Sequence, residues 1–350
     1  MPAGRFPVPG QEHLKVLIVT DAWKPQVNGV VTTLELLGHE LAAMGHEVRY
    51  ATPEGRFSIP LPTYPEIRLA IFPRAGLEKI IREFAPDAVH IATEGTMGMS
   101  ARAICLKHGI EFTTAFHTRY PEYVHARFPF VPESLVWTWE RWFHGAAVAT
   151  MARTPAMKRE LEAHGFKNVR LWEGGVDIER FRPIPGTSLP FPKPIFLYVG
   201  RVSVEKNIEA FLDLNLPGTK VVVGPGPARE ALASKYPAVK FLGPKSGEDL
   251  VRAYCASDVT VFPSLTDTFG LVMLESLACG TPVATFPRDV MLDVVGNCPA
   301  AALDTDLGAA CRRALTLPRD QARPFVLNHS ASASTRQFLS NLQVEQPQDA

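Results

Sequence analysis

Short apolar runs that end in polar residues recur along this chain, and segments with helical spacing separate them. The run Lys15–Asp21 and the run Ile195–Gly200 are typical. Runs of this length, apolar nearly throughout, are expected of parallel strands buried on both faces. After the first run, Leu34, Leu37 and Leu41 recur at helical spacing and predict a covering helix. Strand and helix in alternation restrict the chain to a doubly wound α/β fold with a parallel sheet.

The same pattern continues to residue 286. It predicts further strands at 48–52, 87–93, 112–117, 146–151, 220–224, 259–262 and 282–286, with helices at 97–108 and 156–164 among those between them. In sheets of this kind, ligands bind at the carboxyl ends of the strands. Polar residues that follow the strands are therefore the candidates for a functional site.

A proline-rich stretch divides the alternation into two halves. Residues 181–194 include five prolines, which resist both helix and central strand and so predict a stiff connector. The length of 350 residues also favours two domains. We predict one Rossmann-like domain at 1–185, a second at 186–325, and a C-terminal segment at 326–350. That segment can return to the first domain, and its polar end at 343–350 is expected to fray.

Composition excludes several classes of protein. The formal net charge is +0, which gives no electrostatic case for nucleic-acid binding. The cysteines are scattered without a C-x-x-C motif, at positions 105, 255, 279, 298 and 311, which favours a reduced compartment. Residues 1–15 lack the apolar core of a signal peptide, and no apolar run is long enough to span a bilayer. A cytoplasmic protein with at most peripheral membrane contact is expected.

The segment 264–275 carries the strongest chemical signal. Asp267 precedes a turn that contains Gly270, and Glu275 follows on a predicted helix. Eight helical residues span roughly 12 Å, which is the length of a sugar diphosphate rather than of a metal site. Between the two acids, the amides of Phe269, Gly270 and Leu271 open the helix and can hold an anion. The segment therefore predicts two hydroxyl acceptors on either side of a phosphate site.

Two cations follow the first strand of the second half. Arg201 offers a planar fork of donors and Lys206 a compact charge, just after Gly200. Both lie where a ligand is expected, and together they can neutralise a diphosphate. The alternative is a surface arginine and lysine on a loop, which the nearby 264–275 segment disfavours.

The first half offers weaker signals. Gly29, followed by Val30, sits just before a helix and after the first strand, where a glycine lets a ligand approach the backbone and exposes the helix amides. The alternative is a glycine that serves only the turn, and a full G-x-G-x-x-G motif is absent, which argues against a dinucleotide oxidoreductase. His117 ends a strand and can bond a sugar hydroxyl, or alternatively a nearby carbonyl.

Together these motifs resemble the retaining family-4 glycosyltransferases of the GT-B fold, in which two doubly wound Rossmann-like domains face each other across a cleft. The matching pieces are N-G-V at 28–30, F-H-T at 116–118, G-R-V-S-x-E-K-N at 200–207 and D-T-F-G-L-V-M-L-E at 267–275. The resemblance implies that residues 1–185 form the acceptor side and 186–325 bind a nucleotide sugar. The chain is most similar to bacterial diacylglycerol glycosyltransferases, which are glycolipid synthases, and to related α-mannosyltransferases.

The resemblance also implies roles for single residues. Arg201, Lys206 and His117 would be catalytic: the two cations bind the leaving diphosphate and the histidine contacts the donor sugar. Glu275 would hold the ribose hydroxyls, and Asp267 the transferred sugar. The implied donor-binding positions are Gly29, Val30, Asp267, Thr268, Phe269, Gly270, Leu271 and Glu275. The leaving phosphate itself would take the acceptor proton, so no second catalytic carboxylate is needed.

Two positions depart from the family pattern. The first acid is usually glutamate, and Asp267 is one methylene shorter; Pro225 stands where relatives often carry an aspartate. No metal and no other cofactor are expected, with the nucleotide sugar as co-substrate. The only D-x-D motif, Asp304 to Asp306, lies late in the chain and is interpreted as a solvated loop.

The acceptor is predicted to be a lipid such as diacylglycerol, with UDP-glucose or UDP-glucuronate as donor, at the inner face of the membrane. Residues 119–143 are aromatic and basic, as at a bilayer surface, although Trp139 and Trp142 also fit a core helix. Asp21, Arg119 and Tyr120 are placed on the acceptor side by position. The alternatives are a GDP-mannose-dependent α-mannosyltransferase, a nucleotide-sugar 2-epimerase and a non-catalytic nucleotide-sugar sensor.

Overall fold

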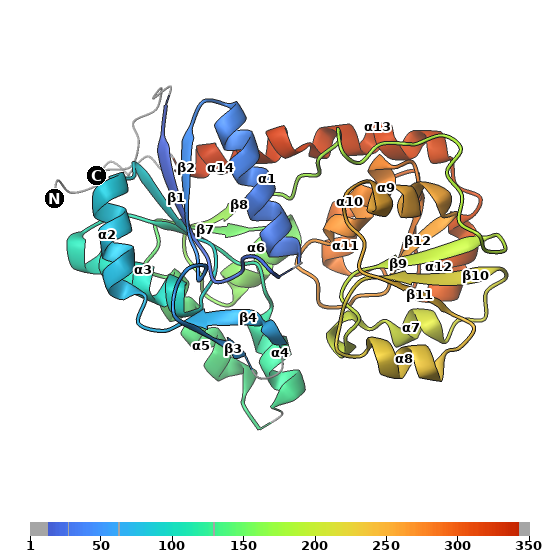
Figure 1. The fold of residues 1–350 in the computed structure, drawn as a ribbon, viewed down its shortest axis with the longest axis horizontal. Helices are drawn as coiled ribbons and strands as arrows, with labels where there is room; N and C mark the ends of the chain where they lie inside the picture. The colour runs from blue at the N-terminus through green and yellow to red at the C-terminus, as the bar shows by residue number, and fades with distance from the viewer. Residues whose placement is uncertain (1–12, 27, 62–63, 129, 343–350) are drawn as a thin grey trace. The chain divides into compact units, whose positions relative to one another are not determined.

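The computed structural model describes residues 13–26, 28–61, 64–128 and 130–342. The chain divides into two compact units, one from Met1–Glu173 with Ser334–Ala350 and the other from Gly174–Ala333. Each unit contains a six-stranded sheet with helices on both faces (Figure 1). Two doubly wound halves are what the strand–helix alternation predicted, and they agree with the Rossmann-like domains that the resemblance implies.

The first unit has a parallel sheet in the order β2-β1-β5-β6-β7-β8 and a separate antiparallel hairpin, β3-β4. Its strands are β1 (Lys15–Val19), β2 (Glu47–Ala51), β3 (Ser58–Leu61), β4 (Tyr64–Ala70), β5 (Ala88–Ile91), β6 (Thr113–Ala115), β7 (Ala149–Ala152) and β8 (Val169–Leu171). Its helices are α1 (Gly29–Ala43), α2 (Arg74–Phe84), α3 (Thr96–His108), α4 (Tyr120–Arg127), α5 (Glu133–His144), α6 (Pro155–Ala163) and most of α14 (Ala331–Leu342).

Alternate side chains of the first strands enter two different cores. Leu17 packs with Ile81 of α2 and with residues of α3, whereas Ile18 packs with Leu37 of α1 on the other face. Phe338 of α14 joins this second core. Burial on both faces explains why the strands read as continuous apolar runs.

The second unit has a parallel sheet in the order β11-β10-β9-β12-β13-β14. Its strands are β9 (Ile195–Val199), β10 (Thr219–Val223), β11 (Lys240–Gly243), β12 (Val259–Phe262), β13 (Val283–Thr285) and β14 (Ala301–Leu303). Its α-helices are α7 (Glu209–Leu212), α8 (Arg229–Lys235), α9 (Gly247–Ala256), α10 (Leu271–Ala278), α11 (Asp289–Val295), α12 (Leu307–Ala314) and α13 (Ala322–Val326). Short 3-10 turns are η1 (Val204–Lys206), η2 (Arg319–Gln321) and η3 (Leu327–His329).

Both sheets reverse their strand order beside their first strand. In the first unit β1 lies between β2 and β5, and in the second β9 lies between β10 and β12. Loops that leave two neighbouring strands in opposite directions open a crevice at their carboxyl ends, and ligands bind there. Figure 1 shows α7 and α8 on one side of the second sheet and α9 and α10 on the other.

The structure confirms the predicted strands and adds four elements that the pattern did not predict: the β3-β4 hairpin, β8, β11 and β14. These strands are short or partly exposed, so they lack a long apolar run. The chain passes between units at Glu173 and Gly174, and the proline-rich residues 181–194 belong to the second unit. The predictions for residues 1–12 and for the tail at 343–350 lie outside the described residues.

All five cysteines are free thiols, and four of them are buried. None of the helices in the described part of the chain combines the length and the apolarity that a membrane crossing requires.

Candidate functional site

The two cations and the first acid predicted from the sequence lie on the loops at the strand reversal of the second sheet. Arg201 and Lys206 follow β9, and Asp267 follows the neighbouring strand β12. The Nζ of Lys206 lies 2.5 Å from Oδ1 of Asp267, and the two side chains are 23% and 19% exposed. An ion pair therefore bridges the two loops at the edge where ligands bind, and it remains within reach of solvent.

Glycine backbone allows the β9 and β10 loops to touch. A Cβ at Gly224 would lie 1.9 Å from the carbonyl oxygen of Gly200, and φ at Gly224 is 143°. The carbonyl of Pro225 accepts a hydrogen bond of 2.7 Å from the amide of Val202. Pro225 thus supplies backbone support to the Arg201 loop.

The helix α10 begins after a glycine. Gly270 occupies the N-cap with φ 85°, a left-handed conformation that suits glycine, and it brings no side chain of its own to cap the first amides. Phe269 packs its ring so closely on Gly174 that a Cβ there would lie 2.1 Å from the ring. This packing fixes the turn before α10, whose amides point where an anion can bind.

Glu275, on α10, is buried and accepts a hydrogen bond of 2.7 Å from the hydroxyl of Tyr254. Burial raises the pKa of Glu275, although Tyr254 and the charge of Arg180 act in the opposite direction. Tyr254 lies on α9, and no sequence motif pointed to it. Its hydroxyl orients the carboxylate that the resemblance assigns to the ribose.

The D-x-D motif lies between the strand β14 and the helix α12, and its second acid caps that helix. Oδ1 of Asp306 accepts hydrogen bonds from the amides of Gly308 and Ala309 at 2.8 and 3.1 Å, and Asp304 pairs with Arg313. These contacts give both acids a structural partner at the start of α12.

In the first unit, Gly29 and Val30 begin α1, and the side chain of Asn28 caps it. Oδ1 of Asn28 accepts hydrogen bonds of 3.0 Å from the amides of Val30 and Val31. Gly29 is exposed, whereas Val30 is partly buried beside the core. A ligand at this helix end would therefore meet Gly29 and the Asn28 side chain first.

Asp21 follows β1 and caps the neighbouring helix α3. Its carboxylate accepts hydrogen bonds from the amides of Met97 and Gly98 at 2.9 and 3.2 Å and from the hydroxyls of Thr93 and Thr96. Burial raises the pKa of Asp21, while these four hydrogen bonds act to lower it. Asp21, which was predicted to line the acceptor side, is thus hydrogen-bonded to its own fold and only slightly exposed to solvent.

His117 lies at the end of β6 against a buried cation and a tryptophan. Its ring meets Trp172 edge-on at 5.7 Å between centroids, and Arg153 stacks over the same tryptophan at 4.4 Å. Burial, together with the charges of Arg153, His90 and His144, holds the pKa of His117 well below its usual value. The imidazole is therefore neutral, and it can donate or accept a hydrogen bond to a sugar hydroxyl.

Arg119 and Tyr120 begin α4. Arg119 forms a bidentate pair with Glu160 at 2.8 and 2.5 Å and also bonds Glu122. Tyr120 meets Trp139 edge-on, and burial with the nearby acids Glu94 and Glu140 raises its pKa well above the usual value. Their assignment to the acceptor side stays a prediction, and Arg119 would have to exchange Glu160 for a ligand.

The aromatic segment divides between core and surface. On α5, Trp137 and Phe143 are buried, whereas Trp139 and Trp142 are 36% and 50% exposed. Phe128 and Phe130, between the helices, are 50% and 81% exposed. The core-helix interpretation therefore holds for Trp137 and Phe143, and membrane contact of the exposed side chains stays a prediction.

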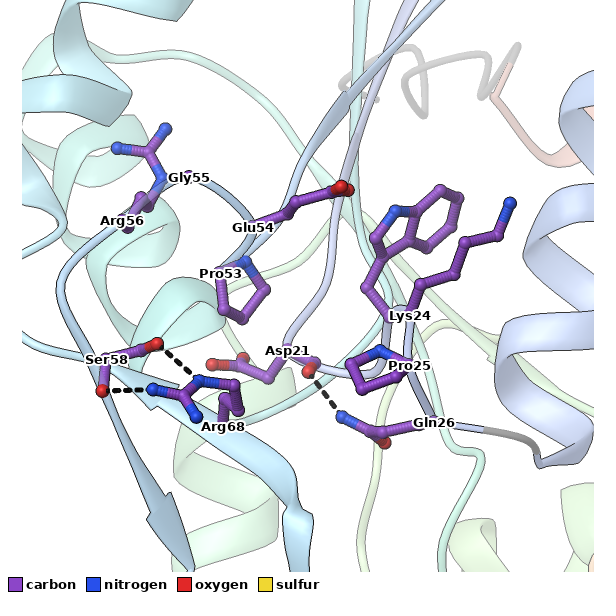
Figure 2. A pocket seen from close by; sticks show the side chains of 11 residues that line it. Asp21, Lys24, Pro25, Gln26, Pro53, Glu54, Gly55, Arg56, Ser58 and Arg68 are labelled. Atoms are coloured by element: carbon purple, nitrogen blue, oxygen red, sulfur yellow. Dashed lines mark hydrogen bonds between the residues drawn. The ribbon is translucent and has the colours of Figure 1, made fainter.

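A pocket of about 450 Å³ lies at the carboxyl ends of β1 and β2 (Figure 2). Its charged lining residues are Asp21, Lys24, Glu54, Arg56 and Arg68. The guanidinium of Arg68 is held by two hydrogen bonds to Ser58, at 2.8 and 2.7 Å. The pocket belongs to the first unit, and its lining carries three cations and two acids; Nζ of Lys24 also lies 2.7 Å from Oε1 of Glu35.

Sequence models of two protein families match this chain. The family described as Glycosyltransferase Family 4 matches residues 27–180, and the one described as Glycosyl transferases group 1 matches residues 193–316. A "GDP-mannose-dependent alpha-mannosyltransferase" of Mycolicibacterium smegmatis is 30% identical over 343 residues, which cover 86% of this chain and 90% of that protein.

Two further relatives extend the comparison. An "Alpha-monoglucosyldiacylglycerol synthase" of Streptococcus pneumoniae is 25% identical over 88% of this chain and 79% of that protein. Among solved structures, a sucrose-phosphate synthase from Thermosynechococcus elongatus has a TM-score of 0.75 at 22% identity, and the match covers 93% of this chain and 97% of that one. The structural likeness supports the fold.

Proposed function

We propose that this chain, which belongs to the family-4 glycosyltransferases of the GT-B fold and is a hexosyltransferase, moves its hexosyl unit from a nucleotide-diphosphate sugar to a lipid hydroxyl. The observation that best supports this proposal is the ion pair between Lys206 and Asp267 at the strand reversal of the second sheet. It puts a cation beside a hydroxyl acceptor where a diphosphate and its sugar would lie.

The donor would lie along the loops that follow β9 and β12. The amides at the start of α10 receive a phosphate, and Glu275, oriented by Tyr254, accepts from the ribose hydroxyls. When the donor binds, its diphosphate competes with Asp267 for Lys206. Asp267 is then released to accept hydrogen bonds from the sugar.

Transfer would retain the anomeric configuration. The bond between the anomeric carbon and the diphosphate oxygen breaks, the acceptor oxygen bonds the same carbon, and the acceptor proton passes to the leaving phosphate. Arg201 and Lys206 stabilise the charge that develops on the leaving group. His117, held neutral by its surroundings, hydrogen-bonds the donor sugar.

The acceptor would enter from the first unit. The pocket at the ends of β1 and β2 has Lys24, Arg56 and Arg68 at separate places in its lining, and these cations suit a polar headgroup with an anionic substituent. Exposed aromatic side chains on the same unit, including Phe130 and Trp142, suit the surface of a bilayer. The similarity to the alpha-monoglucosyldiacylglycerol synthase of Streptococcus pneumoniae also favours a lipid acceptor.

For the donor we place GDP-mannose first and UDP-glucose second. The relative of Mycolicibacterium smegmatis, at 30% identity, is named for GDP-mannose, and the more distant one of Streptococcus pneumoniae for a glucosyl product. UDP-glucuronate is a third candidate.

The test is a thermal-shift panel of GDP-mannose, UDP-glucose and UDP-glucuronate, followed by transfer assays with diacylglycerol and phosphatidylinositol in vesicles. One donor should raise the melting temperature and give a glycolipid with retained configuration. Free epimerised sugar formed without acceptor would identify a 2-epimerase. Tight donor binding without transfer to any lipid extract would identify a sensor.

Replacement of Glu275 by glutamine should weaken donor binding tenfold or more while the protein stays folded. The charge-assisted bonds to the ribose contribute about 1.5 kcal/mol or more, and glutamine still accepts from Tyr254. Calorimetric titration with the donor's nucleotide measures the effect. Glu248→Gln, an exposed acid on α9, is the control. Equal affinity in the two variants would refute the ribose assignment.

The purified protein should co-sediment with vesicles that contain anionic lipid, and less so at high salt. Phe130→Ser combined with Trp142→Ser should reduce the bound fraction severalfold, because both side chains are at least half exposed. Leu292→Ser, at a 46% exposed position of the second unit, is the control. A bound fraction that the double substitution leaves unchanged would exclude these side chains from the membrane contact.

A further inference from the structure

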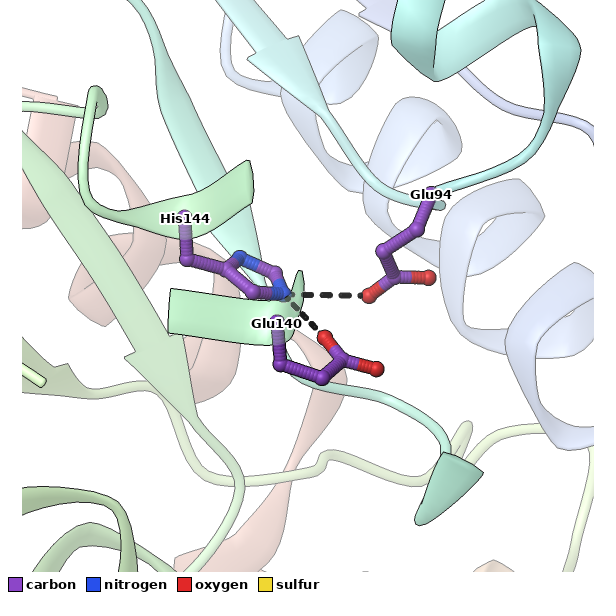
Figure 3. Close-up of side chains that lie close together, drawn as sticks. All are labelled: Glu94, Glu140 and His144. Carbon is purple, nitrogen blue, oxygen red and sulfur yellow. Dashed lines mark hydrogen bonds and ion pairs between the residues drawn. The ribbon is translucent and has the colours of Figure 1, made fainter. Parts of the chain in front are cut away.

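Three buried ionisable side chains that the proposed reaction does not use meet in the first unit. Glu94 follows β5, and Glu140 and His144 lie one turn apart on α5 (Figure 3). Nε2 of His144 is 3.1 Å from Oε2 of Glu140 and 3.2 Å from Oε1 of Glu94. Figure 3 shows both carboxylates directed at the same nitrogen.

The other nitrogen of His144 is already engaged. Nδ1 lies 2.8 Å from the hydroxyl of Thr114, which in turn donates to Thr150 at 3.3 Å. Thr114 therefore accepts from Nδ1–H, and this bond fixes the ring with Nε2 toward the two acids. An imidazole held in this way by an outer hydrogen bond is the usual arrangement of a metal-binding histidine.

Nε2 can carry one hydrogen, and two carboxylates compete for it. The contact with Glu140 has the alignment of a hydrogen bond, whereas the contact with Glu94 is close but unaligned. In the described part of the chain, Oε1 of Glu94 and Oε1 of Glu140 have no hydrogen-bond partner. Two buried carboxylate oxygens of this cluster thus lack a donor, which is costly unless something else binds them.

The apolar surroundings make the lack of hydrogen-bond donors for these carboxylates more costly. Glu94, Glu140 and His144 are 5%, 0% and 1% exposed. The rings of Phe116, Phe143 and Phe166 pack around the imidazole at 5.1 to 6.1 Å between centroids. With an imidazolium and two carboxylates the cluster would hold a net negative charge in this apolar shell. A divalent cation with two carboxylates and a neutral imidazole has no net charge.

We propose that Glu94, Glu140 and His144 bind one divalent transition-metal cation of the Zn²⁺ type. Zn²⁺ takes histidine nitrogen and carboxylate oxygen at about 2.0–2.1 Å, so two ligands of a tetrahedral site lie roughly 3.3 Å apart. The observed 3.1 and 3.2 Å match that spacing, and all three ligand atoms lie within 4.8 Å of one another. The ion ties α5 to the carboxyl end of β5. It is structural and takes no part in the transfer.

A shared proton is the competing occupant of the same centre. Burial lowers the pKa of His144, but the hydrogen bond to Glu140 and the charge of Glu94 outweigh burial and raise it above its usual value. Both occupants explain why the three groups lie together. They differ in metal content and in the effect of a metal on stability.

The experiment measures metal in untagged full-length protein from zinc-supplemented medium. Because the ligands are buried, the ion enters during folding, so protein is also unfolded in chelator and refolded with or without Zn²⁺. We expect one zinc per chain, a higher melting temperature after refolding with Zn²⁺, and loss of the zinc in His144→Gln and Glu140→Gln. Glu133→Gln, at an exposed acid in the first turn of the same helix, is the control and should keep it.

All five tryptophans, at 23, 137, 139, 142 and 172, lie in the first unit, so their fluorescence follows the unfolding of that unit alone. If His144→Gln fails to fold, refolding of the wild-type protein still decides the matter. Two results would overturn the proposal in favour of the shared proton. One is a wild-type protein that holds no more metal than His144→Gln, and the other is a wild-type melting temperature that Zn²⁺ does not change. Donor binding in the second unit is a separate readout.

Discussion

Replacement of Lys206 by alanine is expected to lower turnover about a hundredfold or more. Lys206 lies at the strand reversal of the second sheet, paired with Asp267 at 2.5 Å. In the proposed reaction its charge stabilises the leaving diphosphate, and loss of one such preorganised group costs about 2.7–4 kcal/mol of transition-state stabilisation. Initial rates with saturating donor and a lipid acceptor measure the change in kcat.

A matched control lies in the same unit. Lys235 also pairs with an acid, Glu209, at 2.5 Å, but its side chain is 61% exposed and lies outside the site. Lys235→Ala should leave turnover within a factor of two. If Lys206→Ala behaves like Lys235→Ala, then Lys206 does not act on the leaving group. A normal melting temperature in both variants ensures that the comparison concerns catalysis.

Replacement of Asp21 by alanine should destabilise the first unit by about 3 kcal/mol. The N-cap of α3 is Gly95, which has no side chain, and Asp21 caps the helix from β1 instead. Alanine would leave the amides of Met97 and Gly98 buried without this acceptor. A lost cap costs about 1–2 kcal/mol, and each unsatisfied buried donor adds a similar amount.

Tryptophan fluorescence during thermal unfolding isolates this effect, because every tryptophan is in the first unit. Thr154→Ala is the matched control: Thr154 caps α6 of the same unit and accepts from one amide, that of Met157, so a loss of about 1 kcal/mol is expected. If Asp21→Ala lowers the melting temperature of the first unit no more than Thr154→Ala does, the Asp21 cap of α3 is dispensable. Asp21 would then be free to bind an acceptor.

Local sequence predicted the elements whose burial is uniform and the motifs whose members are close in the chain. The strand β9 reads as an apolar run because both of its faces are covered. Glu275 lies on the helix α10, whereas Asp267 lies on the turn before Gly270, so helical geometry fixes only the part of their spacing that falls within α10. The hairpin β3-β4 escaped prediction because it lies apart from the parallel sheet and contains Pro60 and Pro65.

The sequence by itself determined the doubly wound halves, the family and the short motifs, because periodicity and neighbouring residues carry that information. Only the tertiary structure decided which partners distant side chains meet. It joined Lys206 to Asp267, Tyr254 to Glu275, and Glu94 to Glu140 and His144, and it bound Asp21 to the helix α3. Each of these contacts depends on which strands are neighbours and where their carboxyl ends meet, and no local pattern encodes that order.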